Sequence, residues 1–258
     1  MGFLEDIVET TRAGIARRRA ERPLEELMAE LEPPGRGWPF SEALIAPGVS
    51  LIAEMKRASP SKGLIRPGAD VVQIVRMYEA AGASACSILT EPEFFGGSLD
   101  DLRAARAACS LPLLRKDFIV DEYQLVEARL AGADAALLIV AATGDEMLHD
   151  LLAFGHGIGL DLLVEVHDED DVESAVAAGA EIVGINNRNL KTLEVDRETV
   201  LRLLPDIPAG TTVVAESGIT DHAEVRRLEE AGVDAILVGE ALMGAADPAG
   251  AVRALLGR

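Results

Sequence analysis

The chain lacks the features that mark membrane, secreted and nucleic-acid-binding proteins. No apolar run approaches the ~20 residues of a membrane-spanning helix, and the stretch MGFLEDIVETTR carries acids where a signal peptide has an apolar core. The only two cysteines, Cys86 and Cys109, show neither metal-ligand spacing nor a disulfide framework. A formal net charge of −20 argues against a nucleic-acid partner, which needs a basic footprint. We therefore expect a cytoplasmic protein that binds neither membranes nor nucleic acids.

Lysine is scarce as well. Only four of the 24 basic residues are lysines, namely Lys56, Lys62, Lys116 and Lys191. Arginine stays protonated in proteins, whereas lysine can release and recover a proton. The lysines are therefore candidates for chemistry. A bias in genomic base composition explains their small number but not their positions.

The pattern that is present is an alternation of short apolar runs with helical spacing from Val49 onward. The expected strands begin at Val49 and then cover 85–89, 111–118, 135–141, 161–166, 182–187, 212–217 and 235–239. Eight such strands in about 200 residues predict an α/β fold, a (β/α)8 TIM barrel. An open doubly wound sheet is the alternative, although the turn SPSKG matches its Gly-rich loop poorly.

A repeated tag supports the barrel. Ala-Gly-Ala or Ala-Gly-Val occurs at 81–83, 131–133, 178–180 and 231–233, each time shortly before an even-numbered strand. We expect these glycines to end helices in the left-handed conformation. The repeating unit is then about two βα modules.

The first 47 residues do not follow this alternation. Residues 1–31 have helical spacing interrupted at Pro23, and a Pro/Gly-rich linker leads to a short helix from Ser41. We expect one domain over residues 1–258, with 1–47 as a helical extension packed on a barrel of 48–258. At the other end, Asp247 is expected to cap a last helix opened by Pro248.

Polar side chains collect where the expected strands end, which in a barrel is the face that carries the active site. The residues are Glu54, Lys56, Lys116, Glu165, Asn186, Arg188, Glu216 and Ser217. Glu54 with Lys56, and Asn186 with Arg188, are i, i+2 pairs and therefore share a face. A solvated ion pair would explain one such pair. Convergence from five strands predicts a site.

Two further parts of this face suggest a ligand with an anionic end and an apolar end. Gly218 and Gly239 follow the seventh and eighth strands, where barrels often bind phosphate; ordinary turn geometry is the alternative. Apolar loop residues lie on the same face, either to receive a flat ring or to anchor the loops. They are Pro60, Phe94, Phe95, Phe118 and Leu190.

The chain resembles the indole-3-glycerol phosphate synthases of tryptophan biosynthesis. The motifs that carry the resemblance are IAEMKRASPSKG, LLRKDFIVDEYQ, LLVEVHDE, GINNRNLKTLEVD, ESGI and LVGEALM, in this order and at the separations of that family. The resemblance covers essentially the whole chain, including the helical extension. It implies a lyase reaction without cofactor or metal. In it, 1-(2-carboxyphenylamino)-1-deoxyribulose 5-phosphate, an anionic sugar phosphate, is cyclised with loss of CO2 and water.

The resemblance also implies roles for individual residues. Lys116 falls on the acid that protonates the ketone oxygen as the aryl ring attacks, and Glu165 on a group that stabilises cationic intermediates and takes part in proton transfer. Glu54 and Lys56 are implied in the later dehydration and in holding the substrate's carboxylate or phosphate. Asn186, which with Arg188 orients the substrate and Lys56, and Glu216 complete the implied catalytic set. The implied binding residues are Arg188, Ser59, Ser217, Gly218, Gly239, Glu240, Pro60, Phe95, Phe118 and Leu190.

Some positions depart from the family pattern. Glu240 stands where some relatives have a small hydroxyl residue, so we expect phosphate contact there through backbone N–H groups only. Ala215 and Gly244 replace a common serine and a frequent arginine. None of these changes removes an implied catalytic group. We also expect Lys56 and Arg188 to lower the pKa of Lys116 well below that of a free lysine.

Two alternative functions are also compatible with the sequence. One is another phosphate-binding barrel enzyme, either a sugar-phosphate isomerase or a Schiff-base aldolase. The other is an inactive barrel that serves as a binding partner. We expect a monomer, and the resemblance leaves open an association with other enzymes of the tryptophan pathway.

Overall fold

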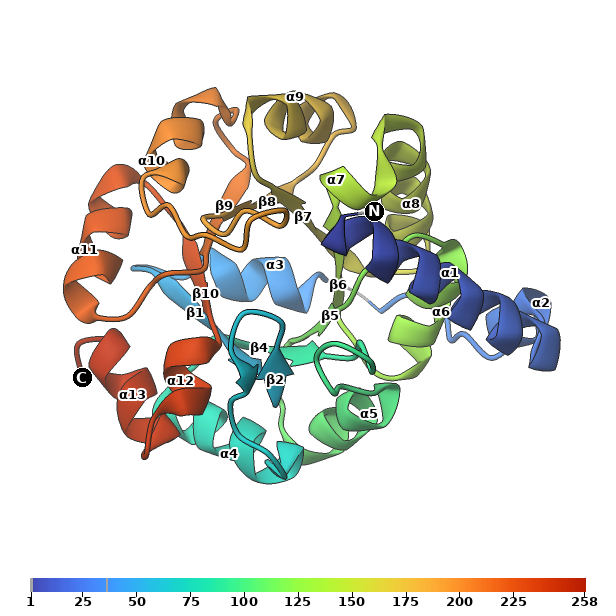
Figure 1. Ribbon diagram of the computed structural model, residues 1–258, viewed down its shortest axis with the longest axis horizontal. Coiled ribbons are helices and arrows are strands. Elements are labelled where there is room, and N and C mark those ends of the chain that lie inside the picture. The colour runs from blue at the N-terminus through green and yellow to red at the C-terminus, as the bar shows by residue number, and fades with distance from the viewer. Residues whose placement is uncertain (1, 36) are drawn as a thin grey trace.

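A closed parallel barrel forms the centre of the molecule (Figure 1). The computed structural model describes residues 2–35 and 37–258, and over these residues the barrel has eight strands. They are β1 (Ser50–Met55), β4 (Ala85–Leu89), β5 (Leu113–Lys116), β6 (Ala135–Ile139), β7 (Asp161–Val166), β8 (Ile182–Asn186), β9 (Thr212–Glu216) and β10 (Ala235–Val238). Their order, β1-β10-β9-β8-β7-β6-β5-β4, makes every strand a neighbour of those before and after it. The predicted (β/α)8 barrel is confirmed.

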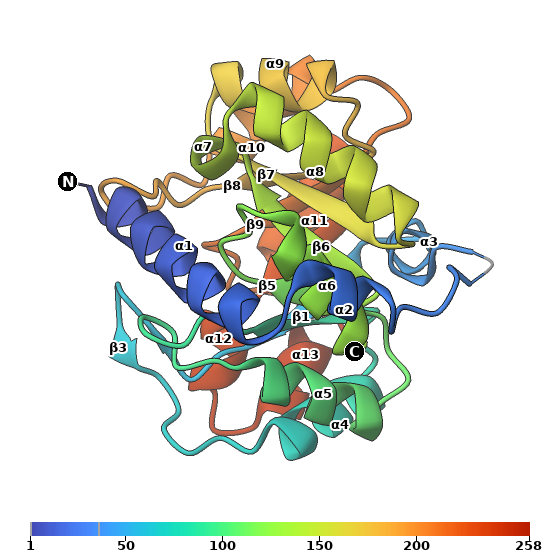
Figure 2. The same ribbon diagram turned by 90° about the vertical axis from the view of Figure 1, so that its right-hand side faces the viewer.

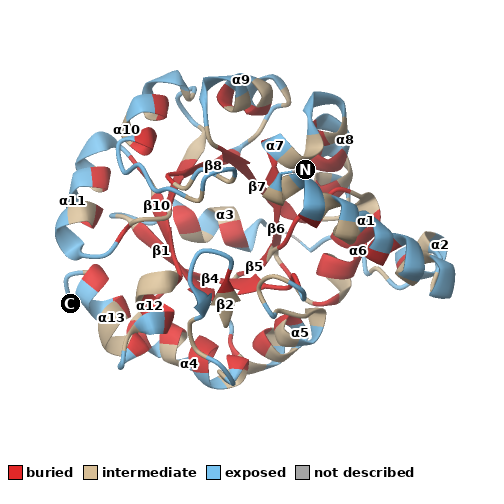
Figure 3. Cartoon of the chain, in the orientation of Figure 1, coloured by how far each residue is buried: buried red, intermediate tan, exposed pale blue. Residues whose placement is uncertain are grey.

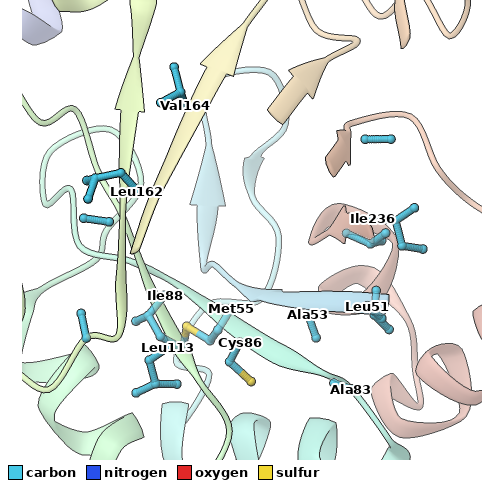
Figure 4. Packing of buried hydrophobic residues seen from close by; sticks show 14 of the residues in the cluster. Leu51, Ala53, Met55, Ala83, Cys86, Ile88, Leu113, Leu162, Val164 and Ile236 are labelled. Carbon is cyan, nitrogen blue, oxygen red and sulfur yellow. The ribbon is translucent and has the colours of Figure 1, made fainter. Parts of the chain in front are cut away.

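Helices surround the barrel and bury its outer surface. The main ones are α4 (Val71–Ala81), α5 (Leu99–Ala108), α6 (Glu122–Leu130), α8 (Asp145–Gly157), α9 (Glu169–Ala177), α10 (Thr199–Leu203), α11 (His222–Ala231) and α13 (Pro248–Leu255). Shorter pieces are α7 (Val140–Thr143), η1 (Leu204–Asp206) and α12 (Glu240–Gly244). Strands covered on both faces have near-continuous apolar sequences. Leu51, Ala53 and Met55 of β1 accordingly point outward into the main core cluster, part of which Figure 4 shows. Figure 3 shows the buried strands inside helices whose outer faces are exposed.

The four tag glycines have the backbone conformation that the sequence predicts. Gly82, Gly132, Gly179 and Gly232 have φ angles of 95°, 90°, 82° and 102°. This left-handed region is disfavoured for residues with a Cβ atom. The glycines thus let each helix end abruptly, so that the chain can turn into the next strand.

The N-terminal helices lie at both ends of the barrel. They are α1 (Phe3–Glu21), α2 (Leu24–Met28) and α3 (Pro39–Leu44). The backbone N–H of Ser41 in α3 donates to Asp161, the first residue of β7, over 2.9 Å, which places α3 at the amino end of the barrel. In Figure 2, α3 lies at the end opposite the small hairpin of β2 (Ala58–Ser59) and β3 (Gly63–Leu64). The division of the chain at residue 47 stays a prediction.

The α1 helix packs on α6 and α7. Arg18 of α1 pairs with Glu127 of α6 at 2.6 Å, and Glu127 lies 3.5 Å from the buried Arg115 of β5. This chain of charges connects α1 to the barrel wall. Within the described ranges, no helix combines the length and apolarity needed to cross a membrane.

Several predicted element bounds are wrong by a few residues. β5 covers only Leu113–Lys116, because the Asp117 side chain turns back to accept from the N–H of Phe118 and from Arg115. β6 ends at Ile139, because the apolar run that follows it coils into α7.

The predictions for the terminal helices need similar corrections. α2 stops at Met28 before Leu31, and α3 begins at Pro39, which occupies its first turn, before Ser41. Asp247 stands at the N-cap of α13 without a capping hydrogen bond; its carboxylate lies 3.7 Å from Arg253 instead.

Candidate active site

A cavity of about 590 Å³ opens where the carboxyl ends of the barrel strands meet. This volume lies in the range of small-molecule sites. Phe94, one of the apolar residues expected on this face, packs against Phe3 and is not among the lining residues. Every residue of the implied catalytic and binding sets lines the cavity. These are Glu54, Lys56, Ser59, Pro60, Phe95, Lys116, Phe118, Glu165, Asn186, Arg188, Leu190, Glu216, Ser217, Gly218, Gly239 and Glu240.

Lys116, Glu165 and Glu216 are in contact and form the polar centre of this cavity. The Lys116 Nζ donates to Glu165 Oε2 over 2.7 Å and to Glu216 Oε2 over 2.8 Å. The three residues end or nearly end β5, β7 and β9, and both carboxylates have only 2 % of their surface exposed. Strand alternation explains why these three side chains are in contact, because each of their positions points into the barrel.

A second lysine–carboxylate pair comes from β1 and the residue that follows it. Lys56 Nζ lies 2.7 Å from Glu54 Oε1. Glycines on the strands next to two of the acids make room for them: a Cβ atom at Gly239, directly after β10, would collide with Glu54 of β1, and one at Gly184 of β8 would collide with Glu216 of β9. The small residues thus allow charged side chains to occupy the inside of the barrel.

The charges inside the barrel correct the predicted pKa of Lys116. Burial lowers this pKa, but the carboxylates of Glu165, Glu216 and Glu54 outweigh burial, so the pKa of Lys116 is raised above that of a free lysine. The prediction of a lowered pKa is therefore wrong. It assumed that cations surround Lys116, whereas the groups in contact with it are acids.

The two carboxyl groups that hold Lys116 have different pKa values. Burial alone would raise the pKa of Glu165. The positive charges of Lys116 and then of His167 outweigh burial and lower this pKa to well below the ordinary value. For Glu216, burial and the nearby Glu165 charge outweigh the effect of Lys116, and its pKa is raised to about 7. The neighbouring charges explain this division: Glu165 has two groups that lower its pKa, Lys116 and His167, whereas for Glu216 only Lys116 does so.

We predict a pH-dependent gain in stability for Glu216→Gln. A raised carboxyl pKa favours the folded state while the group is protonated, and this benefit is lost as the pH rises from the ordinary 4.5 to about 7. The loss amounts to about 3 kcal/mol. Urea unfolding should therefore show no difference near pH 4.5 and a variant more stable by up to about 3 kcal/mol near pH 8. A difference that does not depend on pH would contradict the assignment.

Asn186 and Arg188 lie where the sequence places them, but Asn186 contacts Glu165 rather than Lys56. Its Nδ2 donates to Glu165 Oε1 over 3.0 Å, and its Oδ1 accepts from the backbone N–H of Arg188 over 2.9 Å. The Arg188 guanidinium donates to the Leu193 carbonyl and lies 3.4 Å from the Glu240 carboxylate. The pair thus links the polar centre to the cavity rim.

The rim beside β9 and β10 has a left-handed turn with cations near it. Ser217 and Gly218 have φ angles of 64° and 80°, and the left-handed conformation is unfavourable for the serine. The Asn187 side chain stabilises this turn by donating to the Ser217 carbonyl over 3.0 Å. Glu240 opens α12, and its carboxylate lies between Arg188 and Lys62, the latter at 3.3 Å.

The opposite wall of the cavity is apolar. The rings of Phe95 and Phe118 lie 6.2 Å apart, and Leu190 also faces the cavity. Phe3 of α1 joins this wall and packs edge-on against Phe94 at 5.6 Å. The sequence gives no signal for Phe3, because only the tertiary fold brings α1 to the cavity.

One other residue, His167, could have been found from the sequence. His167 lies two positions after Glu165, on the same face by strand alternation. Its Nε2 is 3.2 Å from Glu165 Oε1. Asn187 follows Asn186, but its contact with Ser217 depends on the neighbouring strand. Arg197, which also lines the cavity, comes from a loop whose path cannot be read from periodicity.

The fold and the site together define a (β/α)8-barrel enzyme whose cavity combines a buried lysine–carboxylate centre with an apolar wall. The particular family follows from comparison with known proteins. The profile described as "Indole-3-glycerol phosphate synthase" matches residues 4–255. The chain belongs to the indole-3-glycerol phosphate synthase family, whose members are carboxy-lyases of amino-acid biosynthesis.

Two proteins with this name are similar to the chain over nearly its whole length. An indole-3-glycerol phosphate synthase of a Nocardioides species is 50% identical over 260 residues, which is 100% of this chain and 99% of that protein. Indole-3-glycerol phosphate synthase 2 of Streptomyces coelicolor is 47% identical and covers 99% of both. Among solved structures, a 3-hexulose-6-phosphate synthase matches 81% of this chain and 99% of its own with a TM-score of 0.66. At 18% identity, that likeness supports the barrel fold alone.

Proposed function

We propose that the protein converts 1-(2-carboxyphenylamino)-1-deoxyribulose 5-phosphate into indole-3-glycerol phosphate, CO2 and water, with Lys116 as the general acid of ring closure. Family membership supports the reaction. The observation that carries the residue assignment is the position of Lys116, held between Glu165 and Glu216 at the floor of the cavity.

Lys116 protonates the ketone oxygen as the aryl carbon attacks the carbonyl carbon. Its raised pKa keeps the ammonium group charged until negative charge develops on that oxygen. Glu165, which stays ionised, stabilises the positive charge that develops on the ring and nitrogen after attack. Loss of CO2 restores the aromatic ring.

Glu54 and Lys56 act in the later dehydration. Lys56 donates a proton to the departing hydroxyl, and Glu54, 2.7 Å from it, holds the ammonium group in place. Glu216 accepts a hydrogen bond from the Lys116 ammonium group. Because its pKa is about 7, Glu216 can also gain or lose a proton near neutral pH. Asn186 orients Glu165 through its side-chain amide.

The substrate lies with its ring on the apolar wall and its phosphate at the rim. Phe95, Phe118, Leu190 and Pro60 contact the ring. The phosphate accepts hydrogen bonds from backbone N–H groups at the two glycine turns and from cationic side chains near them. The residues assigned to it are Ser59, Ser217, Gly218, Gly239, Glu240 (through its backbone) and Arg188.

Replacing Arg188 should weaken substrate binding more than it slows the chemistry. A hydrogen bond to a charged group contributes about 1.5–3 kcal/mol, so Arg188→Gln should raise KM by roughly 10- to 100-fold with a small change in kcat. Glu240→Gln provides the matched opposite change. Its carboxylate competes with phosphate for Arg188 and Lys62, so KM should fall. Steady-state kinetics measure both, and an unchanged KM in Arg188→Gln would remove Arg188 from the binding set.

A product assay with purified protein tests the proposed reaction, and borohydride trapping tests the acid role. General acid catalysis leaves no imine on Lys116, whereas a Schiff-base aldolase would be trapped with a ketose phosphate. The monomeric state, the association with other pathway enzymes and the cytoplasmic location also stay predictions. Gel filtration with light scattering addresses the first of them.

A further inference from the structure

His167 lies between two carboxylates directly behind the polar centre. It follows β7 by one residue, and only 11 % of its side chain is exposed. Nε2 is 3.2 Å from Glu165 Oε1, and Nδ1 is 3.2 Å from Asp171 Oδ2 of α9. Asp171 also accepts from the backbone N–H of His167 over 2.8 Å, which fixes the ring at the start of the helix.

We propose that His167 is a positively charged positioning residue, which keeps the Glu165 carboxylate ionised and fixed beside Lys116. This inference rests on the role given to Glu165 in the proposed function. His167 itself has no contact with the reacting atoms in that proposal and acts only through Glu165.

The surroundings of the ring favour its charged form. A neutral imidazole has one N–H group, so one of its nitrogens would turn a lone pair toward a carboxylate oxygen. Both nitrogens lie 3.2 Å from a carboxylate oxygen, and only the imidazolium form has no lone pair beside either negative charge. Burial lowers the pKa of His167, but the nearby carboxylates of Asp171 and Glu165 outweigh burial and raise the pKa to about 10. Among the described residues, these two carboxylates are the ion-pair partners of the ring.

The charges then alternate through the barrel wall. Asp171, His167, Glu165, Lys116 and Glu216 form a continuous row in which each neighbour has the opposite charge when all are ionised. Without His167, Glu165 would keep Lys116 as its cationic partner and lose the charge on its other side. The pKa of Glu165 would then rise, because an opposite charge within ~4–6 Å lowers a carboxyl pKa by about 1–3 units.

Asn186 and His167 make different contributions to Glu165 Oε1. Asn186 donates an aligned hydrogen bond to this oxygen over 3.0 Å. His167 Nε2 is close to the same oxygen but has no aligned hydrogen bond in the described part of the chain. Asn186 therefore orients the Glu165 carboxylate, and His167 provides a positive charge beside it. Loss of the charge should appear in the pH dependence of the reaction rather than in substrate binding.

The test compares His167→Gln with wild type by kinetics across pH. Gln keeps a polar group of similar reach but no charge. We expect KM to stay within about twofold and the ratio of variant to wild-type kcat to fall toward acid pH, as Glu165 begins to take up protons. His149→Gln on α8, whose side chain is 67% exposed, is the matched control and should behave as wild type. A uniform loss of kcat at every pH, or no loss at all, would overturn the proposal.

An NMR titration of the imidazole nitrogens gives a readout that does not depend on activity. The His167 ring should stay doubly protonated well above pH 6.5, the ordinary value, and titrate near pH 10. If His167→Gln does not fold, Asp171→Asn offers a second variant, in which the His167 pKa should fall by about 1–3 units. A His167 ring that is neutral at pH 8 in the wild type would overturn the proposal. Full activity of Glu165→Gln, by contrast, would refute the role given to Glu165 in the proposed function and leave the reaction itself and the charge of His167 standing.

Discussion

Lys116→Met is expected to lower kcat by about 10²–10⁴-fold, the usual contribution of a positioned general acid. Methionine has a similar length but cannot donate a proton to the ketone oxygen. The change also leaves two buried carboxylates, Glu165 and Glu216, without the ammonium group that each contacts at 2.7–2.8 Å. The fluorescence of the indole product measures kcat of the variant and of the wild type, and circular dichroism shows whether the variant is folded.

Lys191→Met is the matched control for this variant. Lys191 lies exposed in the loop after β8 and does not line the cavity, so its replacement should leave kcat unchanged. If Lys116→Met is well folded and as fast as wild type, the acid of ring closure is not Lys116. Lys56, a half-buried lysine that also lines the cavity, would then be the remaining candidate.

Glu165→Gln should have an effect of similar size, about 10²–10⁴-fold on kcat. The carboxylate accepts from donors on both oxygens: Lys116 on Oε2 and Asn186 on Oε1. An amide has only one acceptor oxygen, so its NH2 group must face one of these donors. The variant therefore loses both the charge that stabilises cationic intermediates and the position of Lys116.

A split between kcat and KM distinguishes this effect from general damage. KM should change little, because Glu165 lies at the cavity floor, away from the residues assigned to phosphate. Glu169→Gln, an exposed carboxyl at the start of α9 that pairs with Arg202 at 3.2 Å, should have no effect on either constant. A loss expressed only in KM would assign Glu165 to substrate binding.

The barrel and the composition of its polar centre could be predicted from local pattern. A strand alternates its two faces, so Glu54 with Lys56 and Asn186 with Arg188 had to point the same way. The parallel arrangement then brings strand ends together at one face. For the same reason His167, two residues after Glu165, could have been included from the sequence.

The environment of Lys116 could not be predicted from the same pattern. Strand alternation says that Lys116 faces the barrel interior but not which interior groups touch it. The sequence suggested that Lys56 and Arg188 would be its neighbours. In the structure, Lys56 pairs with Glu54 and Arg188 points to Leu193 and Glu240, so the contacts of Lys116 are both acidic. The sign of the pKa shift depends on these distances, which the shear of the barrel sets.

Contacts between segments that are distant in the sequence could not be predicted either. Phe3 reaches the cavity because α1 packs on α6 and α7, and no local signal in residues 1–21 indicates that. The end of β6 was misjudged because its apolar run continues into α7, where Val140 stays buried in a helix. A short apolar run has the same appearance in a buried strand and a buried helix.

The most direct test of the proposed reaction is to mix the purified protein with 1-(2-carboxyphenylamino)-1-deoxyribulose 5-phosphate and follow indole fluorescence and CO2 release together. We predict one equivalent of indole-3-glycerol phosphate and one of CO2 per substrate, without added metal or cofactor, and no imine trapped by borohydride. Folded wild-type protein that forms no product, or that is inactivated by borohydride in the presence of substrate, would contradict it.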